Sequence, residues 1–137
     1  MRRMTITAHQ AKAVLEAGEA KAIALGVPMN VVVLDAGAHL KAFLRMDGAL
    51  LGSIDVAQRK ARTSALFRAP SEAIWEYCKP GAPAPGLELS NGGLAPFGGG
   101  LPLRGREGAM IGAVGVSGGS VEQDIEVARA AAAALVP

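Results

Sequence analysis

The chain reads FGGGLPLRGREGAMIGAVGVSGGSVEQD from Phe97 to Asp124, and this stretch decides the fold. Two apolar segments, Leu101–Arg104 and Ala109–Val116, flank a short turn with a glycine at each end. This pattern predicts an antiparallel β-hairpin. Gly112 and Gly115 interrupt the second strand, which indicates that another backbone or a ligand lies very close to it.

The stretch continues into a final helix. Ser120 is a typical N-cap and Gln123 stands at the capping-box position. The glycine-rich turn before Ser120 leaves backbone N–H groups that favour a small anion. The pattern G-x-S-x-G around Ser117 also fits a nucleophile elbow, but that site needs a later histidine and none follows. We therefore interpret this segment as a strand-to-helix turn, with an anion site as the open alternative.

The composition and charge of the chain limit the class of protein to which it can belong. The 137 residues predict one domain, residues 1–137, and only 4% are aromatic, so backbones must pack closely in its core. A net charge of +2 with scattered basic residues argues against nucleic-acid binding, and no apolar run is long enough to span a membrane. No apolar segment follows the basic Met1–Met4, so we expect no signal peptide and a cytoplasmic protein. Cys78 is the single cysteine, and no metal site is predicted.

The first half of the chain predicts a helix, a hairpin and a second helix. Thr7 and Gln10 form a capping box, which predicts a helix from about Ala8 to Leu25. Strands are predicted at Met29–Asp35 and His39–Met46, and their connection is too short for anything but an antiparallel pair. A long helix with a stripe of small apolar residues follows. An irregular proline-rich loop then precedes the final hairpin, and a loop of this length is expected to be functional or packed against a partner.

Several segments, in chain order, resemble the motifs of the GlcG/HbpS-like family of haem-binding and related proteins. The family's K-A-x-T-A, F-x-G-G-x-P and G-A-x-G-V-S-G patterns are all represented. The matching segments are VVVLDAGAHL (Val31–Leu40), RMDGA (Arg45–Ala49), KARTSA (Lys60–Ala65), FGGGLPL (Phe97–Leu103) and GAVGVSGG (Gly112–Gly119) followed by Asp124.

This resemblance implies an α+β fold with a central antiparallel sheet of about five strands flanked by helices, of the profilin-like or roadblock-like kind. It also implies assembly into a homodimer, tetramer or octamer. Where a haem-binding member uses an axial histidine, that residue lies on the first helix, so His9 is the candidate here. His9 is otherwise an exposed residue of the first helical turn. Ala38 replaces the second glycine of the family's D-x-G-G turn, so the hairpin is expected to differ slightly.

Two functions of different class follow. The resemblance favours binding of haem or a related tetrapyrrole, with haem as the cofactor. The alternative is a small oligomeric enzyme, of hydrolase or isomerase type, that acts on an anionic carboxylate intermediate of a catabolic pathway. The scarcity of aromatic residues weakens the first hypothesis, and the lack of a recognisable nucleophile–base pair weakens the second.

A small anionic ligand is expected where the glycine-rich segments meet the second helix. In this hypothesis two cations hold a carboxylate, backbone N–H groups supply further donors, and His39 is the candidate for proton transfer. Alternatively, His39 is a surface turn residue, Arg45 pairs with Asp47 or Asp55, and Lys60 lies in solvent. The candidate ligand-binding residues are Arg45, Lys60, Gly99, Gly100, Ser117 and Gly118.

Overall fold

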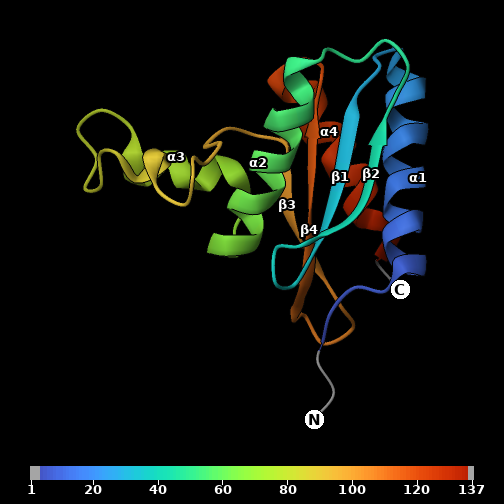
Figure 1. Cartoon of the computed structure of the whole chain (residues 1–137), viewed down its shortest axis with the longest axis horizontal. Coiled ribbons are helices and arrows are strands. Elements are labelled where there is room, and N and C mark those ends of the chain that lie inside the picture. The colour runs from blue at the N-terminus through green and yellow to red at the C-terminus, as the bar shows by residue number, and fades with distance from the viewer. Residues whose placement is uncertain (1–3, 136–137) are drawn as a thin grey trace.

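The structure is a computed structural model that describes residues 4–135, and its centre is a four-stranded antiparallel sheet (Figure 1). The strand order is β2-β1-β4-β3, so two hairpins lie side by side. The prediction of about five strands is therefore wrong by one, because the proline-rich segment between the second helix and the last hairpin adds none. The strands are β1 (Asn30–Asp35), β2 (Leu40–Arg45), β3 (Gly100–Arg104) and β4 (Met110–Ser117).

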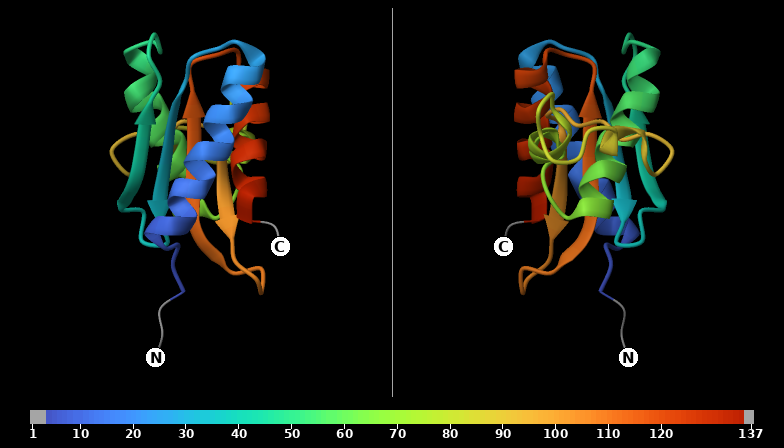
Figure 2. Two further views of the ribbon diagram at one scale, coloured as in Figure 1. Left: turned by 90° about the vertical axis from the view of Figure 1, so that its right-hand side faces the viewer. Right: turned by 90° about the vertical axis from the view of Figure 1, so that its left-hand side faces the viewer.

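Three helices cover the two faces of this sheet, as the perpendicular views in Figure 2 show. The helices α1 (Ala8–Leu25) and α4 (Val121–Ala132) lie together on one face, and α2 (Gly52–Phe67) lies on the other. Alternate strand residues point to opposite faces. Val31 and Val33 therefore join the core beneath α1 and α4, while Val32 joins the alanines of α2. The α+β class predicted from the sequence is confirmed.

Both predicted capping boxes are present. Thr7 accepts a hydrogen bond from Gln10 N at the start of α1, and Ser120 accepts one from Gln123 N at the start of α4. At its other end, α1 stops at Gly26, whose φ of 73° lies in the left-handed region that glycine adopts readily. These local signals explain why the bounds of α1 follow so closely from sequence.

The close approach predicted at Gly115 is made by the backbone of α2. A Cβ atom on Gly115 would collide with the carbonyl oxygen of Ala57, and one on Gly100 would collide with that of Lys60. Gly100 and Gly115 are opposite each other in the β3–β4 ladder. The backbone of α2 therefore packs directly against this glycine pair.

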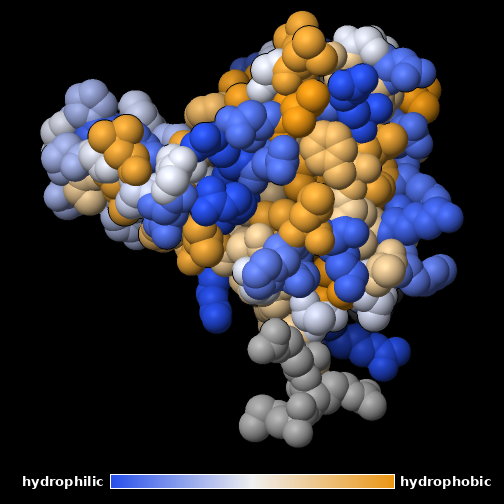
Figure 3. Space-filling view, in the orientation of Figure 1, coloured by the Kyte–Doolittle hydropathy of each residue, from blue (hydrophilic) through white to orange (hydrophobic). Residues whose placement is uncertain are grey.

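The arm, residues 71–96, projects away from the layered body, and Figure 1 shows it extending beyond α2. It contains α3 (Trp75–Cys78) and two short 3-10 turns, and is otherwise irregular, as its prolines predict. The side chains of Tyr77 and Leu89 are exposed in the described chain. Figure 3 shows the arm as a lobe with polar and apolar patches.

Within residues 4–135, no helix combines the length and apolar character needed to cross a membrane. The basic start of the chain, on which the expectation about a signal peptide rests, lies largely outside the described residues. The cytoplasmic location and the single domain stay predictions.

We predict that Gly115→Ala lowers the free energy of unfolding by about 1–3 kcal/mol, because the added methyl group forces α2 away from β4. Gly52→Ala is the matched control, since no atom lies within 4 Å of the position its Cβ would take. Urea denaturation followed by circular dichroism measures both variants. Equal stabilities would show that the contact between α2 and β4 has room for a side chain.

Candidate functional site

Lys60 lies in the middle of α2, and its side chain is only 1% exposed. Its Nζ donates to the carbonyl oxygen of Val116 at 2.9 Å and forms an ion pair with Asp124 Oδ2 at 2.8 Å. The ring centroid of Phe97 lies 5.3 Å from the same nitrogen. Lys60 therefore does not lie in solvent, and its ammonium is not free to bind a carboxylate ligand. Both interpretations of Lys60 drawn from the sequence are corrected by these contacts.

The ion pair joins the two faces of the sheet. Lys60 comes from α2, whereas Asp124 lies in the first turn of α4 on the opposite face. The second carboxylate oxygen, Asp124 Oδ1, accepts the backbone N–H of Gly119 at 2.9 Å. Burial lowers the pKa of the Lys60 ammonium, and the hydrogen bond to Asp124 opposes that shift.

One predicted backbone donor is engaged inside the protein, and the neighbouring glycines are closely packed. The N–H of Gly100 donates to Ser71 Oγ at 2.9 Å. Gly99 has a φ of 127°, and a Cβ there would lie 2.7 Å from Lys60 Nζ. Ser117 is buried, and a Cβ on Gly118 would lie 2.8 Å from the carbonyl oxygen of Pro28. Gly99 packs against the Lys60 side chain and Gly100 against the Lys60 backbone, whereas Gly118 packs against Pro28 and Met29.

The structure does not bring Arg45 to the Lys60 ammonium. In the ladders Arg45 is opposite Asn30, which is opposite Ser117, so Arg45 lies two strands from Ser117, about 10 Å away. The Arg45 side chain is exposed, and it forms no ion pair within residues 4–135. Of the two alternative partners expected for Arg45, Asp55 pairs with Arg59 at 2.6 Å, and Asp47 forms no ion pair within the described residues.

His39 lies at the opposite end of β2 from Arg45, and its side chain is 85% exposed. Its Nδ1 is 3.6 Å from Asp35 Oδ1. Burial tends to raise the pKa of Asp35, but the backbone N–H groups of His39 and Gly37 outweigh it and hold that pKa below its usual range. The surface-turn interpretation of His39 fits this geometry, and the predicted clustering of His39 with the two cations does not form.

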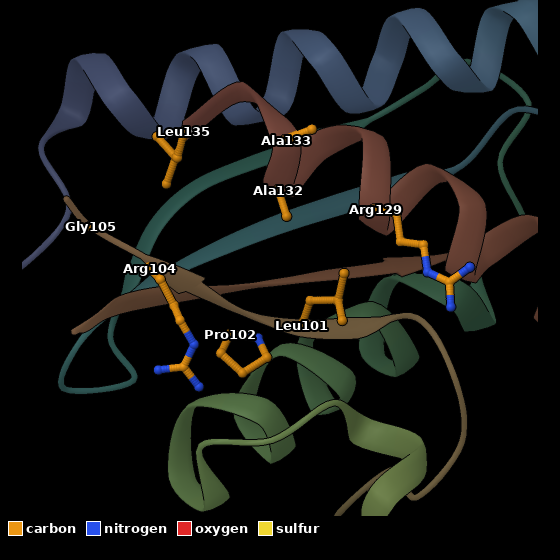
Figure 4. A pocket seen from close by; sticks show the side chains of 8 residues that line it. All are labelled: Leu101, Pro102, Arg104, Gly105, Arg129, Ala132, Ala133 and Leu135. Atoms are coloured by element: carbon orange, nitrogen blue, oxygen red, sulfur yellow. The ribbon is translucent and has the colours of Figure 1, made fainter. Parts of the chain in front are cut away.

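His9 lines a surface pocket of about 410 Å³ together with Arg104 and Arg106. A neighbouring pocket of about 420 Å³ shares Arg104 with it and extends to Arg129 (Figure 4). In Figure 4 the two arginines lie at opposite ends of a wall formed by apolar side chains of β3 and α4. We call the two pockets together the His9 groove. Sequence reasoning selected His9 but missed the arginines. Arg104 and Arg106 belong to the last hairpin and Arg129 to α4, and no sequence motif links them.

A larger pocket of about 870 Å³ lies where the arm meets the start of α4, and we call it the arm groove. Its apolar lining includes Trp75, Phe97 and Val121, each between 41% and 46% exposed. Carboxylates from the arm surround this apolar surface. They belong to Glu72, Glu76 and Glu88.

Comparison with known proteins decides the family. Residues 6–133 match the model of the HbpS-like family, described as haem degrading protein HbpS-like. The chain belongs to the HbpS-like family. The predicted resemblance is thereby confirmed. Protein GlcG of Escherichia coli K12 is 35% identical over 84% of this chain and 83% of its own length.

Two further relatives are similar to this chain over most of its length. An uncharacterized 15.0 kDa protein from the dhaT-dhaS intergenic region of Citrobacter freundii is 43% identical over 93% of this chain and 89% of its own. The corrinoid adenosyltransferase PduO of Salmonella typhimurium is 36% identical over 96% of this chain but only 39% of its own length. This chain therefore corresponds to a minor part of that longer enzyme.

Solved structures agree with the fold throughout. Klebsiella pneumoniae protein ORFY has a TM-score of 0.93 and 36% identity, covering 98% of this chain and 93% of its own. A crystal structure of a PduOC:heme complex has a TM-score of 0.90 and 36% identity, covering 96% of each chain.

We predict that Asp124→Asn lowers the free energy of unfolding by about 3–5 kcal/mol, because it leaves the buried Lys60 charge without its counterion. Glu126→Gln on the same helix is the control. Its pair with Lys21 is long, at 3.8 Å, and half exposed, so its loss is expected to cost about 0–1 kcal/mol. Thermal and urea denaturation of the two variants measures the contrast. Similar small losses would mean that the Lys60 charge finds another partner.

Proposed function

We propose that this protein binds haem or a closely related tetrapyrrole in the His9 groove. The proposal is supported by membership of a family described by haem degradation and by 36% identity to a protein crystallised with haem. One observation on this chain supports it most: an exposed histidine and three arginines line one groove, of which the part between β3 and α4 is apolar.

The residues of the His9 groove suit the chemistry of haem. The His9 imidazole is a typical axial ligand for iron. The guanidinium groups of Arg104, Arg106 and Arg129 suit the carboxylates of the propionate side chains. Ile111 and Leu135 give apolar surface for the macrocycle. When bound, haem supplies a redox-active iron, and the protein sets its axial ligand and surroundings.

The arm groove is the less suitable place for haem, although it is larger. Its carboxylates, Glu72, Glu76 and Glu88, would repel the propionates, and no histidine lines it. The charges around the two grooves therefore favour the His9 groove for an anionic macrocycle.

The protein is also expected to self-associate. Leu50, Leu51 and Leu89 are between 66% and 80% exposed, which is costly for an isolated chain in water. We infer an assembly of at least two copies, with a tetramer or octamer as the finer possibility. Light scattering at micromolar concentration tests this, and a monomer would contradict it.

Hemin titration tests the haem site. We expect a saturable, sharp Soret band with the wild-type protein, and its loss in His9→Ala because the iron loses its axial ligand. His39→Ala is the matched control, since His39 is exposed but does not line the groove. Arg104→Ala is expected to weaken binding at least about tenfold, or about 1.4 kcal/mol. Identical spectra for the wild type and both histidine variants would overturn the assignment of His9.

A further inference from the structure

The arm groove combines an apolar lining with negative charge that the rest of the described chain neutralises only in part. Glu76 forms an ion pair with Lys79 at 2.9 Å, but within residues 4–135 neither Glu72 nor Glu88 has a cationic partner within 4 Å. Lys60 is the nearby interior cation, and Asp124 already compensates it. The groove therefore has an excess of negative charge beside an apolar surface.

Glu88 shows most clearly that a partner is missing. Its Oε1 is buried from solvent and has no hydrogen-bond partner within the described chain. A buried carboxylate oxygen without a donor is costly. The charge of Glu88 also acts on its neighbourhood, since burial and this carboxylate together raise the pKa of the Cys78 thiol. A cation bound in the groove would offset the charge of Glu88 at a distance, although the buried Oε1 itself offers no surface for direct contact.

Glu72 lies against the wall of the same groove. A Cβ on Gly98 would lie 2.9 Å from Glu72 Oε2 and would also collide with Ile125. The glycine thus keeps open the space that the carboxylate faces. The partly exposed rings of Trp75 and Phe97 line the same groove, and aromatic rings attract organic cations. Phe97 already has the Lys60 ammonium 5.3 Å from its ring centroid, so Trp75 is the ring without such a neighbour within the described residues.

We propose that the arm groove binds a small organic cation, a compound with an ammonium or similar group attached to an apolar body. The volume of about 870 Å³ lies in the range of small-molecule sites, about 300–1,000 Å³. A bare metal ion does not fit, because the groove walls are mainly apolar and no metal-ligating cluster occurs within residues 4–135. This site is distinct from the His9 groove in both position and charge.

Trp75 gives a direct readout, because it is the single tryptophan of the chain and lines the groove. Benzyltrimethylammonium is the cationic probe, and its uncharged carbon isostere, neopentylbenzene, is the matched compound. We expect a saturable change in tryptophan fluorescence with the cation, at least about tenfold weaker binding of the isostere, and weaker cation binding at high salt. Equal binding of both compounds, or no saturable change with the cation, would overturn the proposal.

Charge-removing variants locate the site. We expect Glu88→Gln and Glu72→Gln each to weaken binding of the cation at least fivefold while leaving the fold and the hemin titration unchanged. Glu16→Gln is the control, because Glu16 is an exposed residue of α1 outside this groove. This variant should bind the cation with an affinity within twofold of that of the wild type. Unchanged affinity in both groove variants would overturn the proposal. So would light scattering and quenching data showing that a second copy already covers Trp75.

Discussion

The buried ion pair between Lys60 and Asp124 is the interaction on which the rest of the structure depends. It passes beside the end of β4 and connects α2 on one face of the sheet to α4 on the other. Burying two charges is costly, so such a pair contributes little net stability, yet removing one partner is strongly unfavourable. The pair therefore selects one arrangement of the two helices. The pair needs a glycine at position 99, where a Cβ would lie 2.7 Å from Lys60 Nζ, and it needs α4 to begin at Val121, just after its N-cap Ser120.

The buried ion pair explains why the glycine-rich motifs have the sequence pattern of a ligand-binding site. Glycines next to a helix start are typical of anion-binding loops. Here the cation is the chain's own lysine and the anion its own aspartate, so the motif binds an internal ion pair. The candidate ligand sites lie instead on the surface. Arginines line the His9 groove and glutamates line the arm groove, so the two grooves carry opposite charge. The two proposed sites on this small fold therefore differ in the charge of the ligand that each would favour.

Local patterns predicted much of the fold, whereas contacts between distant residues could not be predicted. The capping boxes at Thr7 and Ser120 located two helices, and the turns located two hairpins. The partnership of Lys60 with Asp124 spans 64 positions, and no spacing rule indicates it. Ala38 adopts a φ of 65°, so the turn keeps a glycine-like conformation without glycine. His9 of α1 and the arginines from the last hairpin and α4 line one groove only after these elements have packed.

A double-mutant cycle tests the central role of the ion pair most directly. Lys60→Met, Asp124→Leu and the double variant would be compared with the wild type by urea denaturation. If the pair holds α2 and α4 in place as one unit, each single change leaves a buried uncompensated charge, and the double variant regains part of the loss. We predict a coupling free energy of at least about 2 kcal/mol. Additive losses, with coupling below about 0.5 kcal/mol, would contradict this account.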